Sequence, residues 1–260
     1  MVIDVNDTST STGITHALQD GVLRLGFDRP ARKNAMTGTM YVALTQALMQ
    51  ADGDDAVRVI VLHGSEDAFC AGNDIGDFAT NKRTEGERPS ARFMKALLHV
   101  GKPVVAAVNG PAVGIGATML LHCDLVYAGS AAKLSFPFSK LGLCPEFAST
   151  LVLPAKLGHQ RAAELLLLGE NCSAQQAQAL GLVNAVLPPG EVLPHAVAAA
   201  SKLAGLSAAS LRATKSLMRG DELPGYERRI DQENAHFARL LDSPEAKAAF
   251  ASFLHKSKAG

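Results

Sequence analysis

The chain has 260 residues, and 47% of them are hydrophobic, which is enough for a sizeable core in one large domain or two small ones. Lys plus Arg and Asp plus Glu each number 25, so the formal net charge is zero. This balance gives no indication of binding to nucleic acid or to an anionic membrane. The four cysteines form no C-x-x-C pair, which argues against a zinc site, and no apolar run reaches the ~18 residues of a transmembrane helix.

The first predicted elements are two short strands joined by a tight turn. Ile14 to Leu18 and Val22 to Phe27 flank Asp20-Gly21, and Asp-Gly between two apolar runs is a strong hairpin signal. A basic loop, DRPARKNAMT, follows. Thr37 at its end is expected to cap a helix that continues to about Gln50.

Strands and helices are then expected to alternate, which predicts a mostly parallel sheet packed by helices. The polar residues 79–90 lack periodicity and are predicted to form a mobile loop over a pocket. The expected strands are Val57 to Leu62, Val104 to Val108 and Leu125 to Ala128, with a helix at Ala91 to Val100.

After about residue 155 the sequence favours helices, and Ser173 and Ser207 stand where N-caps are expected. No fixed-period repeat or low-complexity tract is present. The predicted helices are Gly158 to Leu168, Ser173 to Leu180, Val192 to Leu203, Ser207 to Arg219, Tyr226 to Leu241 and Pro244 to Lys256.

Two glycine-containing turns are candidates for binding an anion. In NGPAVGIGATMLLHC a valine-rich strand runs through glycines into a helix start, which leaves backbone N–H groups such as that of Ile115 unpaired. FCAGNDI follows another strand and offers the Asn73 amide as a second donor. FCAGNDI by itself reads as an ordinary turn capped by Asp74, and the pair of turns favours an oxyanion site.

A lone carboxylate, Glu146, lies in the uncharged stretch LCPEFAST. Glu146 is the candidate base. A glutamate after proline also stands at the start of many helices, where its negative charge interacts favourably with the helix dipole. His122, on an apolar face, is predicted to be a core residue.

These stretches resemble the enoyl-CoA hydratase/isomerase, or crotonase, superfamily, and the match runs from DRPARKNAM to ALGLVNAVLP. The resemblance implies an α/β fold, a spiral of β-β-α units with a C-terminal helical trimerisation region. It implies a core with an acyl-CoA site over residues 1–200 and an oligomerisation region over 201–260. By position, the Asn73 and Ile115 amides would hold the thioester oxygen. The substrate would contact Lys33, Ala35, Ala71, Gly72, Asp74, Ile75, Gly114 and Phe138.

The similarity is greatest to Δ3,Δ2-enoyl-CoA isomerases. Thr118 and Phe138 stand where hydratases carry their two catalytic glutamates, and Glu146 stands where the isomerases carry their base. Apolar neighbours of Glu146 are expected to raise its pKa by desolvation: Phe136, Phe138, Leu143 and Phe147.

The expected reaction moves the double bond of a 3-enoyl-CoA through a dienolate. No metal or cofactor is expected beyond the coenzyme A of the substrate. The resemblance also implies a homotrimer or hexamer. A cytoplasmic location is expected, because KSKAG is not a peroxisomal signal. Three alternatives stay open: another crotonase reaction, hydration by an unusual acid–base set, and a non-catalytic acyl-CoA binder.

Overall fold

The structure is a computed structural model that describes residues 12–80 and 87–258. Half of the loop predicted over 79–90, residues 81–86, lies outside these residues. Of the rest, 79–80 belong to α2 (Ile75–Thr80) and 89–90 to α3 (Pro89–His99), so the predicted loop is too long at both ends.

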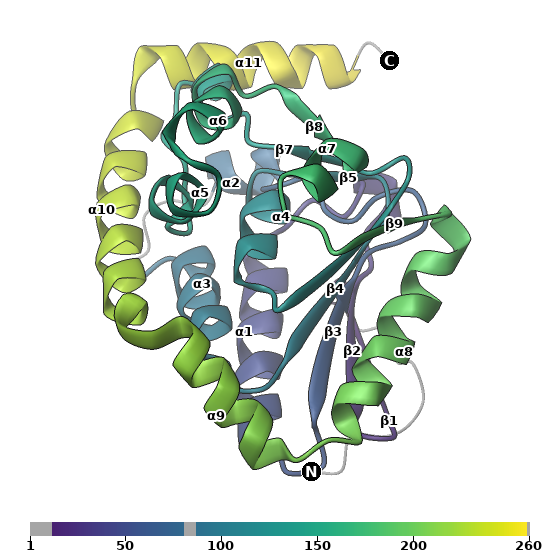
Figure 1. The fold of residues 1–260 in the computed structure, drawn as a ribbon. Coiled ribbons are helices and arrows are strands. Elements are labelled where there is room, and N and C mark those ends of the chain that lie inside the picture. The colour runs from purple at the N-terminus through teal and green to yellow at the C-terminus, as the bar shows by residue number, and fades with distance from the viewer. Residues whose placement is uncertain (1–11, 81–86, 259–260) are drawn as a thin grey trace.

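A six-stranded sheet, ordered β1-β2-β3-β4-β6-β9, forms the centre of the molecule (Figure 1). The first two strands pair antiparallel through the Asp20-Gly21 turn, as predicted, and every later neighbour pair is parallel. The strands are β1 (Ile14–Gln19), β2 (Val22–Phe27), β3 (Val59–His63), β4 (Val104–Val108), β6 (Leu125–Gly129) and β9 (Ala185–Leu187).

A second sheet of three short strands lies beside the first, in the order β5-β7-β8. Its strands β5 (Pro111–Val113) and β7 (Lys133–Ser135) directly follow β4 and β6, whereas β8 (Asn171–Ser173) joins from farther along the chain. From β4 to β7 the chain therefore alternates between the two sheets. This alternation agrees with the spiral of β-β-α units that the family resemblance implies.

The helices agree with the prediction except in a few places. The predicted helix at 158–168 is divided into α6 and a π-helical turn, η4 (Glu164–Leu168). Helix α5 has no counterpart among the predicted helices, and α2 was indicated only by the expected cap at Asp74. The remaining helices are α1 (Gly38–Gly53), α4 (Ile115–Thr118), α5 (Ser149–Leu157), α6 (His159–Ala163), α7 (Ala174–Ala179), α8 (Val192–Ala204), α9 (Ala208–Arg219), α10 (Leu223–Leu241) and α11 (Pro244–Lys258).

Short 3-10 turns connect several of these elements: η1 (Pro30–Arg32), η2 (Met119–His122), η3 (Ser139–Leu141), η5 (Pro189–Glu191) and η6 (Gly220–Glu222). The expectation that the chain is purely helical after residue 155 is wrong, because β8 and β9 lie there. Strands of three residues are too short to show the alternation that identifies a strand in a sequence.

The large sheet is buried on both faces, as its continuous apolar strands require. On one face Val59, Val61 and Val105 pack with Val192 and Ala196 of α8 in a small core. The other face belongs to the main core, which includes α1 and α3.

The last three helices cover the outside of the main core of their own chain (Figure 1). Helix α10 packs against α3 and α5, and α11 packs against η3. The predicted boundary at residue 200 falls inside α8. Within the described residues no single helix is long and apolar enough to cross a membrane. Two helical segments that are sharply bent relative to each other, Pro189–Ala204 and Ala208–Leu241, are together long and apolar enough, by length and composition only.

Candidate active site

Two turns lie next to each other beyond the carboxyl ends of β3 and β4, which are neighbouring parallel strands. Cys70, in the turn after β3, forms a parallel bridge with Ala112 of β5. The Val113 N–H donates to the Cys70 carbonyl over 2.9 Å. The two glycine-containing stretches identified in the sequence are thus joined by backbone hydrogen bonds.

Glycine is needed in these turns because the two backbones approach closely. A Cβ at Gly116 would lie 2.5 Å from the Cys70 carbonyl oxygen, which is closer than real contacts allow. Gly72 adopts φ +93°, and a Cβ there would lie 3.1 Å from the Val113 carbonyl. Both sites therefore favour glycine for reasons of space or backbone conformation.

The structure leaves the two predicted amide donors without acceptors. Within residues 12–80 and 87–258, neither the Asn73 N–H nor the Ile115 N–H donates a hydrogen bond to the protein. The Asn73 side chain is fixed by Tyr41 of α1, whose hydroxyl donates to Asn73 Oδ1 over 2.5 Å. Ile115 is fully buried at the start of α4. Two backbone donors are therefore available for an oxygen atom of a ligand.

The basic loop after β2 lies along the first turn. The Lys33 carbonyl accepts from the Ala71 N–H over 3.0 Å, and the Met36 N–H donates to the Gly72 carbonyl over 2.8 Å. Lys33 has φ +48°, in the left-handed region. This pairing brings Lys33, Ala35, Ala71 and Gly72 together, as the predicted ligand site requires.

Asp74 has a structural role that limits what its carboxylate can offer a ligand. Oδ1 accepts from the Asp77 N–H over 3.1 Å, so Asp74 caps α2, as the sequence indicated. Oδ2 pairs with Arg29 at 3.1 Å. Burial alone would raise the pKa of Asp74, but these hydrogen bonds outweigh it and the pKa is lowered.

Glu146 is buried, with 4% of its surface exposed, and its Oε1 has no hydrogen-bond partner. Two residues in the left-handed region follow it, Phe147 at φ +61° and Ala148 at φ +55°, and α5 begins only at Ser149. The interpretation of Glu146 as a helix-opening residue is therefore wrong. An unpartnered buried carboxyl is costly for a fold, so its position calls for a functional explanation.

Burial, followed by the charge of Glu233, raises the pKa of Glu146 to about 8, while Arg88 acts in the opposite direction. The direction agrees with the desolvation expected from the sequence. The aromatic and aliphatic side chains predicted to surround Glu146 are all buried in the main core: Phe136, Phe138, Leu143 and Phe147.

The charge of Glu146 acts on two residues that belong to the first turn or hold it. After burial itself, the Glu146 charge is the largest cause that raises the pKa of Tyr41, and it also contributes to the raised pKa of Cys70. Tyr41 holds Asn73, and Cys70 belongs to the first turn. Phe138 lies close to Gly114 of the second turn, at the distance of ordinary van der Waals contact for an added Cβ. These contacts are compatible with a site that includes the carboxyl and the two free amides.

Comparisons with known proteins identify the family of this chain. The family model described as "Enoyl-CoA hydratase/isomerase" matches residues 17–260. This chain belongs to the enoyl-CoA hydratase/isomerase family.

The relatives of this family member include both isomerases and hydratases. Enoyl-CoA delta isomerase 2 of Rattus norvegicus is 37% identical over 218 residues, which cover 82% of this chain and 56% of the rat protein. The chain thus matches little more than half the length of that relative. The 2,3-dehydroadipyl-CoA hydratase of Escherichia coli is 33% identical over 239 residues, 92% of this chain and 94% of the relative.

Among solved structures, Pseudomonas aeruginosa OdaA is 46% identical, with a TM-score of 0.92 over 94% of this chain and 100% of that chain. The predicted crotonase-like fold is confirmed. The protein is an enzyme of a family that acts on acyl-CoA thioesters.

The two positions where hydratases of this family carry glutamates hold no ionisable group here. Thr118 is buried, and its hydroxyl donates to the Ile115 carbonyl over 3.4 Å. Phe138 is buried in the main core. Within the described part of the chain, no group of three or more His, Cys, Asp or Glu residues could hold a metal ion.

Three residues near the site were not assigned to it from the sequence: Tyr41, His122 and Glu233. Tyr41 is one of the buried residues of α1. His122 is a core residue, as predicted, and its Nε2–H donates to the Phe147 carbonyl over 2.7 Å. Burial is the main reason that its pKa falls to about 4, so the ring stays neutral. Nothing in the sequence around Glu233 indicates that it lies near Glu146.

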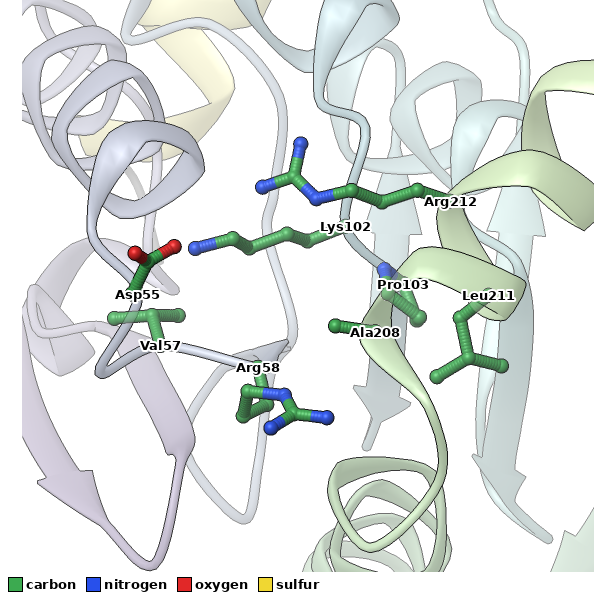
Figure 2. Close-up of a pocket in the computed structure, with 8 residues that line it drawn as sticks. All are labelled: Asp55, Val57, Arg58, Lys102, Pro103, Ala208, Leu211 and Arg212. Carbon is green, nitrogen blue, oxygen red and sulfur yellow. The ribbon is translucent and has the colours of Figure 1, made fainter.

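A separate cavity of about 190 Å³ lies at the opposite edge of the sheet, where Pro103 precedes β4 (Figure 2). The cationic side chains that line this cavity already donate hydrogen bonds to backbone carbonyls. Lys102 donates to the Ala51 and Asp54 carbonyls, and Arg212 donates to the Asp52 carbonyl. None of the predicted site residues lines this cavity.

Proposed function

We propose that the protein is an acyl-CoA isomerase that converts a 3-enoyl-CoA into a 2-enoyl-CoA. The observation that carries the proposal is a buried carboxyl, Glu146, whose Oε1 has no partner, together with two adjacent turns that each offer a free backbone amide. Each part matches one requirement of the reaction, a base and a site for a developing oxyanion.

The reaction begins with ionised Glu146 removing a proton from C2. The electron pair of the C2–H bond then spreads over the thioester and the double bond, which gives a dienolate. The Asn73 and Ile115 amides would hold its oxygen, and loss of one such donor costs ~2.7–4 kcal/mol in comparable sites. Protonated Glu146 returns the same proton to C4, so atoms and charge balance without a further reactant.

One base suffices for this proton transfer, whereas hydration must both activate water and deliver a proton. Thr118 and Phe138 supply neither acid nor base. The burial of Glu146 would also keep water away from the dienolate. These observations support isomerisation over hydration.

The substrate would lie along the basic loop and the two turns. We assign contacts with coenzyme A to Lys33, Ala35, Ala71, Asp74 and Ile75, and contacts with the acyl part to Gly72, Gly114 and Phe138. Because Asp74 already pairs with Arg29, its backbone is the better candidate for a ligand contact. Coenzyme A would enter only as part of the substrate, and the reaction as written needs no other cofactor.

The decisive experiment follows two reactions with the same preparation, isomerisation of 3-enoyl-CoA and hydration of 2-enoyl-CoA. We expect rapid isomerisation and slow or absent hydration. Hydration at a comparable rate would make the protein a hydratase with an unusual acid–base set. Acyl-CoA binding without either reaction would make it a binding protein.

A further inference from the structure

A second buried carboxylate, Glu233, lies behind the turn that carries Glu146. It comes from α10 and has 4% of its surface exposed. Its oxygens accept from the Ala148 N–H at 2.6 Å, the Thr150 N–H at 3.1 Å and the Thr150 hydroxyl at 2.5 Å. The carboxylate therefore supplies the N-terminal cap of α5, which has no cap from its own Ala148.

The backbone held by Glu233 is the left-handed turn directly after Glu146. Phe147 and Ala148 both have positive φ, a conformation that persists only where the surroundings enforce it. The other supports are the His122 ring on the Phe147 carbonyl and the Ser149 hydroxyl on the Glu146 carbonyl, each at 2.7 Å. Glu233 is the only charged group among these supports.

The two carboxyls differ in their partners. Both oxygens of Glu233 are engaged by protein donors, whereas Oε1 of Glu146 has none. Glu233 is thus unsuited to contact a substrate. It can act on the reaction only through the position and the charge state of Glu146.

We propose that Glu233 is a positioning residue for Glu146, because its carboxylate fixes the left-handed turn from which the base projects and places a second negative charge behind it. This inference rests on the proposed function insofar as Glu146 is the base. It also means that a C-terminal helix of the same chain completes the site in the core.

Several other groups act on the two carboxyls. Tyr41 of α1, Cys70 of the first turn and Cys144 on the same loop couple electrostatically to Glu146, and Arg88 before α3 opposes the rise of its pKa. Arg229, one turn earlier on α10, lowers the pKa of Glu233 and donates to the Thr150 hydroxyl over 3.1 Å. Burial remains the largest cause that raises the pKa of Glu233, to about 7.

The test compares Glu233→Gln with the wild type and with Glu227→Gln, which makes the same change at a more exposed site on the same helix. Glu227 pairs with His99 and does not contact the turn. We expect Glu233→Gln to lower kcat about ten- to a hundredfold at pH 9, where Glu146 is ionised in every variant. Glu227→Gln should keep the wild-type kcat.

The pKa of Glu146 provides a readout that does not depend on turnover. It is measured by carbon NMR of protein labelled at the glutamate carboxyl, and the Glu146 signal is the one missing from Glu146→Gln. In Glu233→Gln this pKa should move downward, because the neighbouring negative charge is gone. Glu233→Asp retains the charge but is one methylene shorter, so it should keep the raised pKa and still lose kcat.

The outcomes separate the two proposals. A wild type that does not isomerise 3-enoyl-CoA would refute the proposed function, while the NMR titration would still test the coupling of the carboxyls. A Glu233→Gln protein with unchanged kcat at pH 9, unchanged Glu146 pKa and only a lower melting temperature would overturn the positioning role. If Glu233→Gln does not fold, Thr150→Val removes one donor to Glu233 and should lower kcat several-fold; an unchanged kcat would again refute the role.

Discussion

At the scale of single residues, Glu146 combines two properties that rarely occur together in a stable core. Its carboxyl is buried, and one oxygen has no partner, so the fold carries an unfavourable group. Burial raises its pKa to about 8, which matches its basicity to proton transfer near neutral pH. The site thus sacrifices stability for reactivity at this position.

Replacing Glu146 by Gln keeps the shape of the side chain but removes the base. We expect kcat with 3-enoyl-CoA to fall by ~10²–10⁴-fold. Acyl-CoA affinity, measured by calorimetry, should change little, because the amides and the basic loop are untouched. An active Glu146→Gln protein would require the isomerase proposal to be withdrawn.

The raised pKa of Glu146 predicts two opposite responses to pH. Activity needs the ionised form, so kcat/KM should rise with pH and level off above about 8. Stability should fall over the same range. The folded protein holds the Glu146 proton up to pH about 8, whereas the unfolded chain releases it near the ordinary 4.5.

Urea unfolding at pH 5, 7 and 9 checks the second response. Glu146→Gln should lose less stability than the wild type between pH 5 and pH 9. Glu233, whose pKa is also raised, should account for part of the slope that remains. Equal slopes in the two proteins would contradict the raised pKa of Glu146.

At the scale of elements, the two turns depend on an approach of backbones that only glycine permits. Gly116, the second residue of α4, lies directly against the Cys70 carbonyl. The same contact that excludes a side chain keeps the Ile115 amide beside the first turn. The proposed oxyanion site would therefore depend on strand pairing between β5 and the Cys70 segment.

Gly116→Ala should disturb this arrangement, because its Cβ would lie 2.5 Å from backbone oxygen, which cannot move aside as a side chain does. We expect a loss of ~1–3 kcal/mol in the free energy of unfolding, together with a reduced kcat. Gly53→Ala at the end of α1 is the matched control, since a Cβ there meets nothing within 4 Å. Equal stabilities of the two variants in chemical denaturation would show that the turn can relax.

At the scale of the whole molecule, large apolar side chains remain exposed on the helices after residue 155. Leu217 and Met218 of α9 are 81% and 78% exposed, and Leu167 and Leu168 of η4 are also exposed. Such rows usually mark contacts with other subunits. In the expected oligomerisation region, residues 201–260, the exposed residues of α9 are available for contact with another subunit, whereas α10 packs against its own chain.

We therefore expect a trimer or hexamer in solution. Light scattering at micromolar concentration measures the mass directly. Leu217→Ser combined with Met218→Ser should weaken the assembly if α9 takes part, whereas Val42→Ser, also at an exposed apolar residue but on α1, serves as the control. A wild-type monomer at that concentration would contradict the prediction.

The sequence alone determined those features that depend on neighbours along the chain. Asp20-Gly21 identified the hairpin, Thr37 marked the start of α1, and Val104 to Val108 matched β4 residue for residue. Such signals are local, because turns, caps and apolar runs act over a few residues. The paired glycine turns and Glu146 could also be proposed in this way, with the family resemblance supplying their roles.

Only the tertiary structure decided what surrounds them. The Tyr41 hydroxyl reaches Asn73 across 32 residues of sequence, and Glu233 reaches Ala148 across 85. In the sequence Glu233 looks like any polar residue of an amphipathic helix, and Glu146 looks like a helix opener. Their burial depends on α10 docking against α5, a long-range contact that no local pattern encodes. The electrostatic environment of the proposed base is therefore a property of the assembled fold, since desolvation acts only once the elements have packed.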